Sequence, residues 1–440
     1  MKKVRKSIIY SFWDGCFAQV QFGIVEQFAT PFALFLGASD VAIGALNFIR
    51  SAFVAIIQVY SADITSWLGS RKKLITTSVF VGALLWLPAF FAPFLWPEYQ
   101  VWIFIVLFGL ASAFNMFPSP AWASLMSEYI PPSKRGRYFG WRGMALGLVY
   151  CGSVVAAGVW LQFFQHISLF WSFAILFITA CLARFVSWRF LTLMYEPKWR
   201  VGQADYFSFW QFIRQVRRSN FARFTVLAGL LNFAVALVSP FFAVYMLKEL
   251  RFGYFQFTLL VGAAVLTTFV TQRYWGELAD RYGNMRIIRL SVLLLSLNPF
   301  LWLFSHDFMY LMLIQLSGGF FWAGFMLTSS NFIYDVAVDT KRERCMSYYN
   351  FVCGVGLGGG ALLGGYLYSL SPDWLGSRFF PLLVLSGFLR LFLAWGFRKF
   401  TREVKQVEAV RTKLFIYDLA GSSAVGYLGK RLLTRVRRRS

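Results

Sequence analysis

Long apolar stretches, separated by short polar or charged segments, follow one another along almost the whole chain. A helix needs about 20 mostly apolar residues to cross the hydrocarbon core of a membrane. Twelve stretches are long enough, and they cover residues 8–36, 40–67, 73–93, 99–127, 138–164, 168–190, 222–247, 253–275, 286–305, 308–336, 346–370 and 379–399. Backbone polar groups in lipid must be paired within their own segment, so each stretch predicts a transmembrane helix. The predicted fold class is all-α, a polytopic membrane protein.

Composition supports a membrane location, and the distribution of charge predicts the orientation. Hydrophobic residues make up 58% of the chain and charged residues only 14%, whereas about 25% is usual in soluble domains. The net charge is +24, with Lys and Arg concentrated in every second connection and at both termini. The positive-inside rule then places both termini in the cytoplasm and the chain in the inner (plasma) membrane, next to anionic lipids. This distribution needs no nucleic acid, which we do not expect as a partner.

Short motifs recur in the two halves of the chain. An acidic residue followed by Lys-Arg-x-Arg stands at the same spacing in 128–137 and 335–344, and Thr30-Pro31-Phe32 in the first span corresponds to Ser239-Pro240-Phe241 in the seventh. Such a repeat predicts two pseudo-symmetric six-helix bundles, an architecture typical of transporters. The predicted division is an N-terminal bundle at 1–190, a cytoplasmic linker at 191–221, a C-terminal bundle at 222–399 and a basic cytoplasmic tail at 400–440. We expect a monomer.

Enzyme chemistry and tightly bound cofactors are not expected. The five cysteines form no CxxC pair, and both histidines, His166 and His306, sit in short connections. This is not the clustering that a metal or catalytic site needs. The sequence has no G-x-x-x-x-G-K-[ST] motif for ATP. In the eleventh span Gly356, Gly360 and Gly364 recur every four residues, which predicts either close packing between helices or a flexible point for rocking.

The loop after the eighth span carries a family signature. Gly276-Glu-Leu-Ala-Asp280-Arg281-Tyr-Gly283 resembles the G-x-L-A-D-R-x-G pattern of the major facilitator superfamily, a class of secondary transporters. In the first copy Val59 replaces the glycine, and a longer stretch separates Asp63 from Gly69. The resemblance implies that each loop acid latches one half onto the other while the cytoplasmic side is shut. The expected partner of Asp280 is the start of the fifth span, near 137–142, and that of Asp63 is the start of the eleventh.

A carboxylate in this position can accept hydrogen bonds from the exposed N–H groups at the start of a neighbouring helix. The alternative is that these charges only follow the positive-inside rule. The predicted conformational switch consists of Asp63, Gly69, Arg71, Glu128, Arg135, Arg137, Gly276, Asp280, Arg281, Gly283, Asp335, Arg342 and Arg344.

The first two spans are unusually polar. Gln19, Gly23, Glu26 and Thr30 recur at spacings of four, three and four, which puts them on one helix face, with Gln27 at its edge. Asn47, Arg50 and Gln58 form a similar stripe in the second span. Glu26 and Arg50 both lie on the order of 15 Å from the same membrane surface, so antiparallel helices can bring them together as an ion pair.

An intramembrane charge is costly and therefore suggests a functional site. Glu26 could take up and release a proton as the cavity opens and closes, Arg50 could bind an anionic group of the solute, or the pair could be purely structural. We predict that Gln19, Glu26, Thr30, Asn47, Arg50 and Asn232 bind the solute or couple its movement. Arg142, Arg184 and Arg273 lie nearer the cytoplasmic ends, where snorkelling to the surface is expected.

The chain as a whole therefore predicts a secondary active transporter, coupled to protons, that moves a small solute by alternating access. A polar or anionic metabolite is slightly favoured as the solute. Efflux of amphiphilic compounds and a lipid-handling role of the same fold remain alternatives.

Overall fold

The computed structural model of the chain describes residues 2–130, 132–197, 212, 214, 216, 219–336, 342–374 and 376–404. The first half contains α1 (Lys2–Phe35), α2 (Asp40–Val59), α3 (Ser61–Leu68), α4 (Arg71–Phe91), two 3₁₀ turns, η1 (Ala92–Leu95) and η2 (Pro97–Tyr99), α5 (Gln100–Met116), α6 (Ser119–Tyr129), α7 (Pro132–Phe164) and α8 (Leu169–Leu193). The second half contains α10 (Asn220–Ala236), α11 (Phe241–Val244), a π-helical turn η3 (Tyr245–Glu249), α12 (Tyr254–Tyr282), α13 (Asn284–Leu301), α14 (Phe308–Val336), α15 (Arg342–Leu370) and α16 (Phe379–Phe400).

The predicted all-α membrane fold is confirmed. The described helices group into twelve spans at the predicted positions, because α2–α3, α5–α6 and α10–η3 each form one interrupted span. Ten of the spans are long and apolar enough to cross a membrane by length and hydropathy alone. The other two are α1, which carries the polar stripe, and α13, which has Arg286 and Arg289 in its first two turns.

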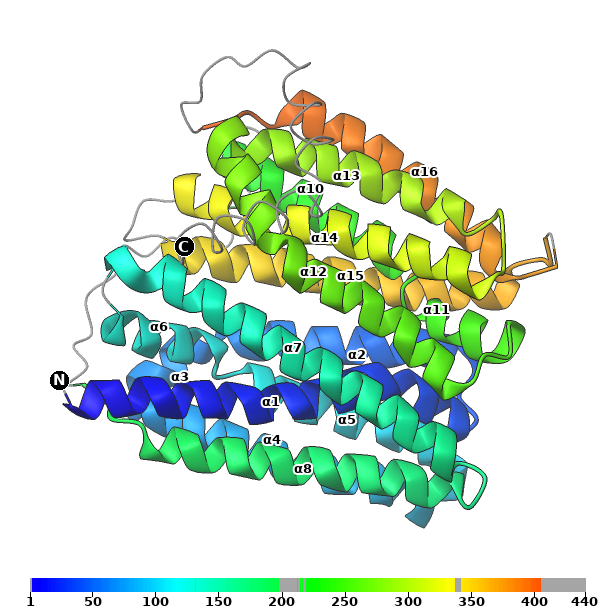
Figure 1. The fold of residues 1–440 in the computed structure, drawn as a ribbon, viewed down its shortest axis with the longest axis horizontal. Helices are drawn as coiled ribbons and strands as arrows, with labels where there is room; N and C mark the ends of the chain where they lie inside the picture. Colours follow the sequence, from blue (N-terminus) through cyan, green and yellow to red (C-terminus); the bar gives the residue numbers. More distant parts are fainter. Residues whose placement is uncertain are drawn as a thin grey trace, which may run out of the picture.

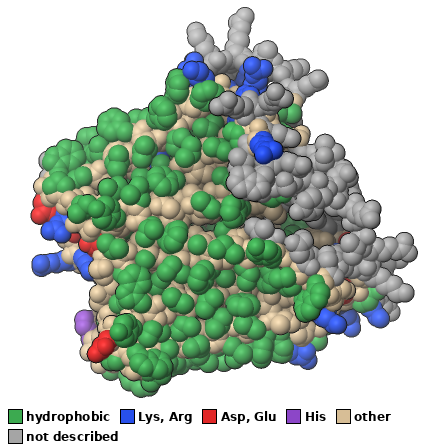
Figure 2. All heavy atoms as spheres, turned by 180° about the vertical axis from the view of Figure 1, so that it is seen from behind, with side chains coloured by type: hydrophobic (Ala, Val, Ile, Leu, Met, Phe, Trp, Pro, Cys, Tyr) green, Lys and Arg blue, Asp and Glu red, His purple; other side chains and the backbone are tan. Residues whose placement is uncertain are grey.

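The spans run back and forth between two ends of the molecule (Figure 1). We call the end where α1, α4, α7, α10, α13 and α15 begin the basic end, and the other the opposite end. Apolar side chains cover most of the face in Figure 2, and charged side chains gather toward the two ends. This distribution is that of a surface immersed in lipid between two aqueous boundaries.

The seventh span is interrupted where its repeat motif lies. Pro31 of the first motif is inside α1, but α10 ends at Ala236 and α11 begins only after Pro240. Proline cannot donate the backbone hydrogen bond that a continuing helix requires. The π-helical turn η3 then follows, a form that is frequent at functional sites. The two halves therefore share a motif but differ in local structure at this point.

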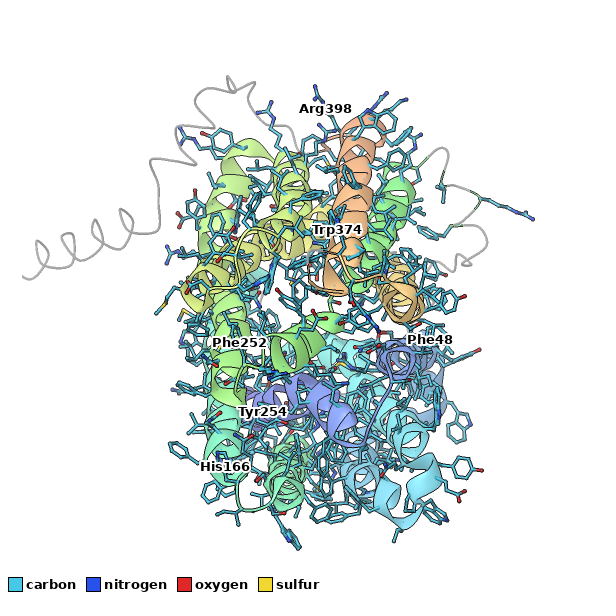
Figure 3. The ribbon with its side chains drawn as sticks, turned by 90° about the vertical axis from the view of Figure 1, so that its right-hand side faces the viewer. Phe48, His166, Phe252, Tyr254, Trp374 and Arg398 are labelled. Atoms are coloured by element: carbon cyan, nitrogen blue, oxygen red, sulfur yellow. The ribbon has the colours of Figure 1, made fainter. Side chains whose placement is uncertain are left out.

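One apolar core joins the two halves at the opposite end. It contains Phe28 and Phe32 of the first half together with Phe241 and Phe257 of the second. The rings of Phe28 and Phe257 meet edge to face at 6.4 Å. Tyr254 packs in the same way against Phe173 of α8 at 6.2 Å. Figure 3 looks along the helices from this end and shows Tyr254 near the boundary between the halves.

The basic end is packed differently. Among the described residues, the apolar clusters there each draw on one half of the chain. One cluster joins α4, α6 and α8, and the two others lie in the second half together with Phe212. The apolar seal between the halves therefore lies at the opposite end.

Small residues let the helices approach closely. Helices α7 and α12 lie side by side where the halves meet (Figure 1), and α2 packs against α15. A Cβ atom added to Gly44 of α2 would lie 2.6 Å from the carbonyl oxygen of Ala361. Within the second half, Cβ atoms on Gly356, Gly360 and Gly364 would overlap carbonyl oxygens of α10. The close packing predicted for these glycines is confirmed.

We expect Gly360→Ala to destabilise the protein by about 1–3 kcal/mol, because the added methyl group meets the carbonyl oxygen of Phe233. The measurement is the unfolding temperature of the purified full-length protein in one detergent. Gly152→Ala is the matched control, since a Cβ atom there meets no heavy atom within 4 Å. Equal shifts in the two variants would contradict the expectation.

Candidate functional site

A cavity of about 290 Å³ lies between the two halves. Its lining residues all belong to the part of each helix nearer the opposite end. They come from α1, α2, the α10–α11 break, α11, η3, α12 and α14, and they are Glu26, Gln27, Thr30, Asn47, Ser239, Pro240, Phe242, Ala243, Met246, Phe257, Val261, Ala264, Val265 and Gln315. Both halves therefore contribute to one central cavity.

Glu26 and Arg50 form the predicted ion pair. The Arg50 guanidinium donates from Nη2 to Glu26 Oε1 across α1 and α2. The side chain of Arg50 remains 30% exposed and that of Glu26 28%. Glu26 lines the cavity. Arg50 contacts Glu26 from α2 and is not itself among the lining residues. The pairing is thus confirmed, and the coupling role of the two residues stays a prediction.

Helix α7 closes one side of this polar region. Gly23 allows the approach, since a Cβ atom there would lie 2.9 Å from the carbonyl oxygen of Tyr150. The hydroxyl of buried Tyr150 is then 2.6 Å from Nε2 of Gln27, which lines the cavity. The sequence indicated Gln27 only as the edge of a stripe. Tyr150 was not predicted, because its place depends on how α7 packs against α1.

The side chain of Asn47 is hydrogen-bonded to the backbone of its own helix. Its Nδ2 donates to the carbonyl oxygen of Ile43, 3.2 Å away on the same helix. This bond uses one of the two amide N–H groups, so the amide oxygen and the second N–H of Asn47 are the groups left for other contacts. Asn47 and Thr30 both line the cavity, as predicted for solute-binding residues.

Two predicted site residues lie elsewhere. Gln19 is half-buried on α1, about 10 Å nearer the basic end than Glu26, and it is not among the lining residues. Asn232 is buried in the second half and donates to the carbonyl oxygen of Ala228 at 2.8 Å. The break after Ala236 carries the chain to the cavity at Ser239 instead. The sequence could not show which turn of the seventh span would reach the cavity.

A second polar group is buried inside the first half. The Ser187 hydroxyl donates to Asp14 Oδ1 at 2.7 Å, and Arg184 donates to the Ser187 oxygen at 3.0 Å and to Asn115 Oδ1 at 2.6 Å. All four residues are buried. Snorkelling was the wrong expectation for Arg184, because hydrogen-bond partners on α5 and α8 hold its charge inside the bundle.

Two further arginines are also held by carbonyl groups. Arg142 donates to the carbonyl oxygen of Ser11 at 2.9 Å and lies 4.6 Å from the centre of the Trp122 ring. Arg390 is buried on α16 and donates to the carbonyl oxygen of Leu295 at 3.2 Å. Arg142 is therefore engaged within the first half, although it lies in the region expected to meet Asp280.

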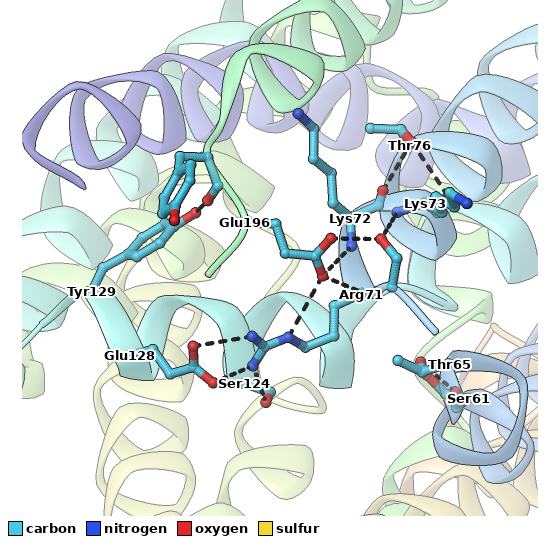
Figure 4. Close-up of polar contacts among 12 residues, drawn as sticks. Ser61, Thr65, Arg71, Lys72, Lys73, Thr76, Ser124, Glu128, Tyr129 and Glu196 are labelled. Carbon is cyan, nitrogen blue, oxygen red and sulfur yellow. Dashed lines mark hydrogen bonds and ion pairs between the residues drawn. The ribbon is translucent and has the colours of Figure 1, made fainter. Parts of the chain in front are cut away.

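Arg71 is the centre of a charge network at the basic end (Figure 4). Its side chain is 1% exposed and forms a two-pronged pair with Glu128, with Nη1–Oε1 at 2.6 Å and Nη2–Oε2 at 3.0 Å. It also donates to Ser124 at 3.1 Å, and its Nε lies 3.9 Å from Glu196. Arg71 and Glu128, both assigned to the switch from the sequence, are thus brought together within the first half.

Glu196 was missed in the sequence. Its carboxylate accepts from the backbone N–H of Arg71 at 2.8 Å and from the Ser70 hydroxyl at 2.6 Å, so it caps the start of α4. The segment that carries it is held by Tyr129, whose hydroxyl donates to the carbonyl oxygen of Tyr195. Burial raises the pKa of Tyr129 to about 12, so this hydroxyl keeps its proton.

The second half repeats the arrangement, with a hydrogen bond in place of the ion pair. Glu403 accepts from the backbone N–H of Met285 at 2.7 Å near the start of α13. Asn284 donates to Asp335 at 2.6 Å, in the place that the Arg71–Glu128 pair takes in the first half. The halves therefore share a capped helix start, but the ion pair of the first half is a neutral-to-charged hydrogen bond in the second.

Further switch residues with described side chains or backbone lie at the basic end. Asp280 and Arg281 are exposed in the last turn of α12, and Gly276 lies one turn earlier. Gly69 and Gly283 both have positive φ, +62° and +89°, where a side chain would strain the turn. The side chains of Asp63, Arg135, Arg137, Arg342 and Arg344 lie outside the described residues, as does most of the predicted linker and tail.

Twelve described spans in two halves, with a cavity lined from both, are the architecture of a membrane transporter. A sequence profile of the Major Facilitator Superfamily matches residues 15–244 and 224–436. The chain therefore belongs to the major facilitator superfamily, a family of transporters rather than enzymes.

Relatives and solved structures agree with this assignment. The quinolone resistance protein NorA of Staphylococcus aureus is 29% identical over 142 residues, which are 32% of this chain and 36% of NorA. The match thus spans about a third of this relative. A bacterial homologue of the human lysosomal transporter Spinster, inward-facing and occupied, superimposes with a TM-score of 0.69 at 12% identity, over 90% of this chain and 97% of that one. A D-xylose-proton symporter superimposes with a TM-score of 0.68 at 14% identity, over 92% of this chain and 98% of that one.

We expect Glu128→Gln to destabilise the protein by about 2 kcal/mol, because it weakens the pairing of a buried arginine. Thermal unfolding of the full-length protein measures this loss. Glu277→Gln is the control, since its pair with Arg273 is exposed on α12 and such pairs contribute at most about 1 kcal/mol. A stability loss in the control as large as in Glu128→Gln would refute the buried role of Arg71.

Proposed function

We propose that the protein is a secondary active transporter that carries a small solute through the central cavity by alternating access. The observation that supports this most directly is a cavity lined from both halves and adjoined by a charged pair. The volume of about 290 Å³ is at the small end of the range of about 300–1,000 Å³ for small-molecule sites. It suits a small solute better than a lipid.

The packing supports a conformation that is sealed at one end. A joint apolar core closes the opposite end, and the clusters of the basic end each belong to one half. We propose that the halves, 1–190 and 222–399, rock about the cavity and that the basic end faces the cytoplasm, in keeping with its Lys and Arg residues. The seal would then separate the cavity from the outer side.

We further propose that Glu26 couples transport to protons. When ionised, Glu26 is held by Arg50; when protonated, it no longer offers a full charge to that partner. Protonation therefore changes the attraction between α1 and α2 beside the cavity. The movement of the halves would in turn change the access of water to the carboxylate.

Glu26→Gln should abolish the response of the conformation to pH. Spin labels at Leu95 and Phe304, one in each half at the opposite end, would report distances in proteoliposomes at mildly acidic and mildly alkaline pH. For one coupled proton, the ratio of populations changes by up to about tenfold per pH unit. Glu277→Gln should respond like the unsubstituted protein. An unchanged pH response in Glu26→Gln would exclude this residue as the coupling group.

Asp280 and the turn that ends at Gly283 are proposed as the latch of the basic end. Asp280→Asn should lower the population in which the halves approach there, because it removes the charge that attracts the start of a helix. Labels at Lys73 and Arg398, one in each half, would show longer distances by the same spin-label method. If their distribution matches that of Glu277→Gln, which also removes a carboxylate of α12, the latch is wrong.

A further inference from the structure

We infer that the central cavity selects a small amphipathic organic cation, with its charged, hydrogen-bond-donating end at Glu26 and its apolar body against α11 and α12. The inference builds on the proposed function, since it names the solute class of the same cavity. It departs from the polar or anionic solute that the sequence favoured.

The polar side of the cavity offers negative charge. Among the lining residues, Glu26 carries the only full charge, and no lysine, arginine or histidine is present. Arg50 engages Glu26 from outside the lining, through a single Oε1 contact. An anion would therefore meet a carboxylate before it met a guanidinium. A cation would gain the attraction instead.

Hydrogen-bond polarity points the same way. The amide nitrogen of Asn47 uses one of its two N–H groups on the carbonyl oxygen of Ile43, and the amide oxygen is a hydrogen-bond acceptor beside the cavity. The carboxylate of Glu26 can only accept when ionised. Glu26 of α1 thus requires a donor from the solute, and the amide oxygen of Asn47 on α2 can accept from a second one, as an ammonium group supplies.

The other side of the cavity is apolar. It is lined by Phe242 of α11, Met246 of η3, and Phe257 and Val261 of α12. These side chains favour a hydrocarbon or aromatic body by burying its surface. The aromatic faces of Phe242 and Phe257 are also compatible with a nearby positive charge. A solute with one donor-rich end and one apolar end matches both sides at once.

Three probes with the same apolar body and different end groups test the inference: phenylbutylammonium, phenylbutanol and phenylbutyrate. Binding to the full-length protein in lipid nanodiscs would be measured by calorimetry at mildly alkaline pH. We expect the ammonium compound to bind at least about tenfold more tightly than the carboxylate, with the alcohol between them. Tighter or equal binding of phenylbutyrate, or no binding of any probe up to millimolar concentration, overturns the inference.

Variants show whether Glu26 causes the preference. Glu26→Gln leaves Arg50 without its partner, so the preference should reverse toward phenylbutyrate. Glu277→Gln removes a carboxylate far along α12 and should keep the original order. Val261→Ala should weaken all three probes by a similar factor. A preference for the ammonium compound that survives in Glu26→Gln overturns the inference.

Asn47→Asp decides the matter if Glu26→Gln does not fold, because it keeps both the size of the side chain and the Glu26–Arg50 pair. It should raise the ratio of ammonium to carboxylate affinity, and an unchanged or lower ratio counts against the inference. Binding and transport can fail separately. A preference for the ammonium compound without pH-dependent movement would contradict proton coupling but not the solute class. Proton-driven uptake of phenylbutyrate would contradict the solute class but not proton coupling.

Discussion

A charge at membrane depth has to be kept away from lipid, and this constraint organises the first half of the molecule. An ionised side chain in the bilayer centre costs at least about 2.5–3.5 kcal/mol on lenient scales. Two groups of paired polar side chains reduce this free-energy cost. Glu26 and Arg50 pair beside the cavity, and Asp14 and Arg184 share Ser187 nearer the basic end. Helix α1 can therefore be polar along its length, because each of its acidic groups has a hydrogen-bonded partner on a neighbouring helix.

The two ends of the molecule are held by different forces. At the opposite end, aromatic and aliphatic side chains from both halves form one core, so separating the halves there would expose apolar surface. At the basic end the described charge networks tie helices together within each half. Arg71, Glu128 and Glu196 connect α4, α6 and the segment after α8. These networks connect helices within each half, as the proposed rigid-body rocking requires.

The sequence predicted those features that depend on depth or spacing along one helix. The Glu26–Arg50 pair follows from equal depths on adjacent antiparallel spans, and the contact of Gly356, Gly360 and Gly364 with α10 follows from a four-residue period. Features set by the packing of distant segments could not be predicted. Tyr150 reaches Gln27 only because Gly23 admits α7, and Glu196 caps α4 from beyond the sixth span.

Some errors had a different cause. Arg184 lies near a helix end, where a long basic side chain usually reaches the surface. In this fold Asn115 and Ser187 supply acceptors inside the bundle, so burial costs less than the position alone implies. Asn232 was assigned to the cavity because it is a polar residue of the seventh span. The break before Pro240 moved the cavity contact to a later turn, and a span treated as one straight helix cannot show this.

The repeat also explains why the cavity has one polar and one apolar side. When the two repeats are aligned on Pro31 and Pro240, the residue that corresponds to Glu26 of the first half is Val235 of the second. The halves therefore keep the same backbone plan, visible in the helix starts capped by Glu196 and Glu403, while the intramembrane carboxylate occurs in one of them. In a rocking transporter, such an asymmetry gives the apolar half a function. Under the proposed rocking movement, the wall of Phe242 and Phe257 would exclude water from the carboxylate when the halves close, and water would reach it when they open. The access of water to Glu26 would then be controlled by a half that contributes no charged side chain to the cavity lining.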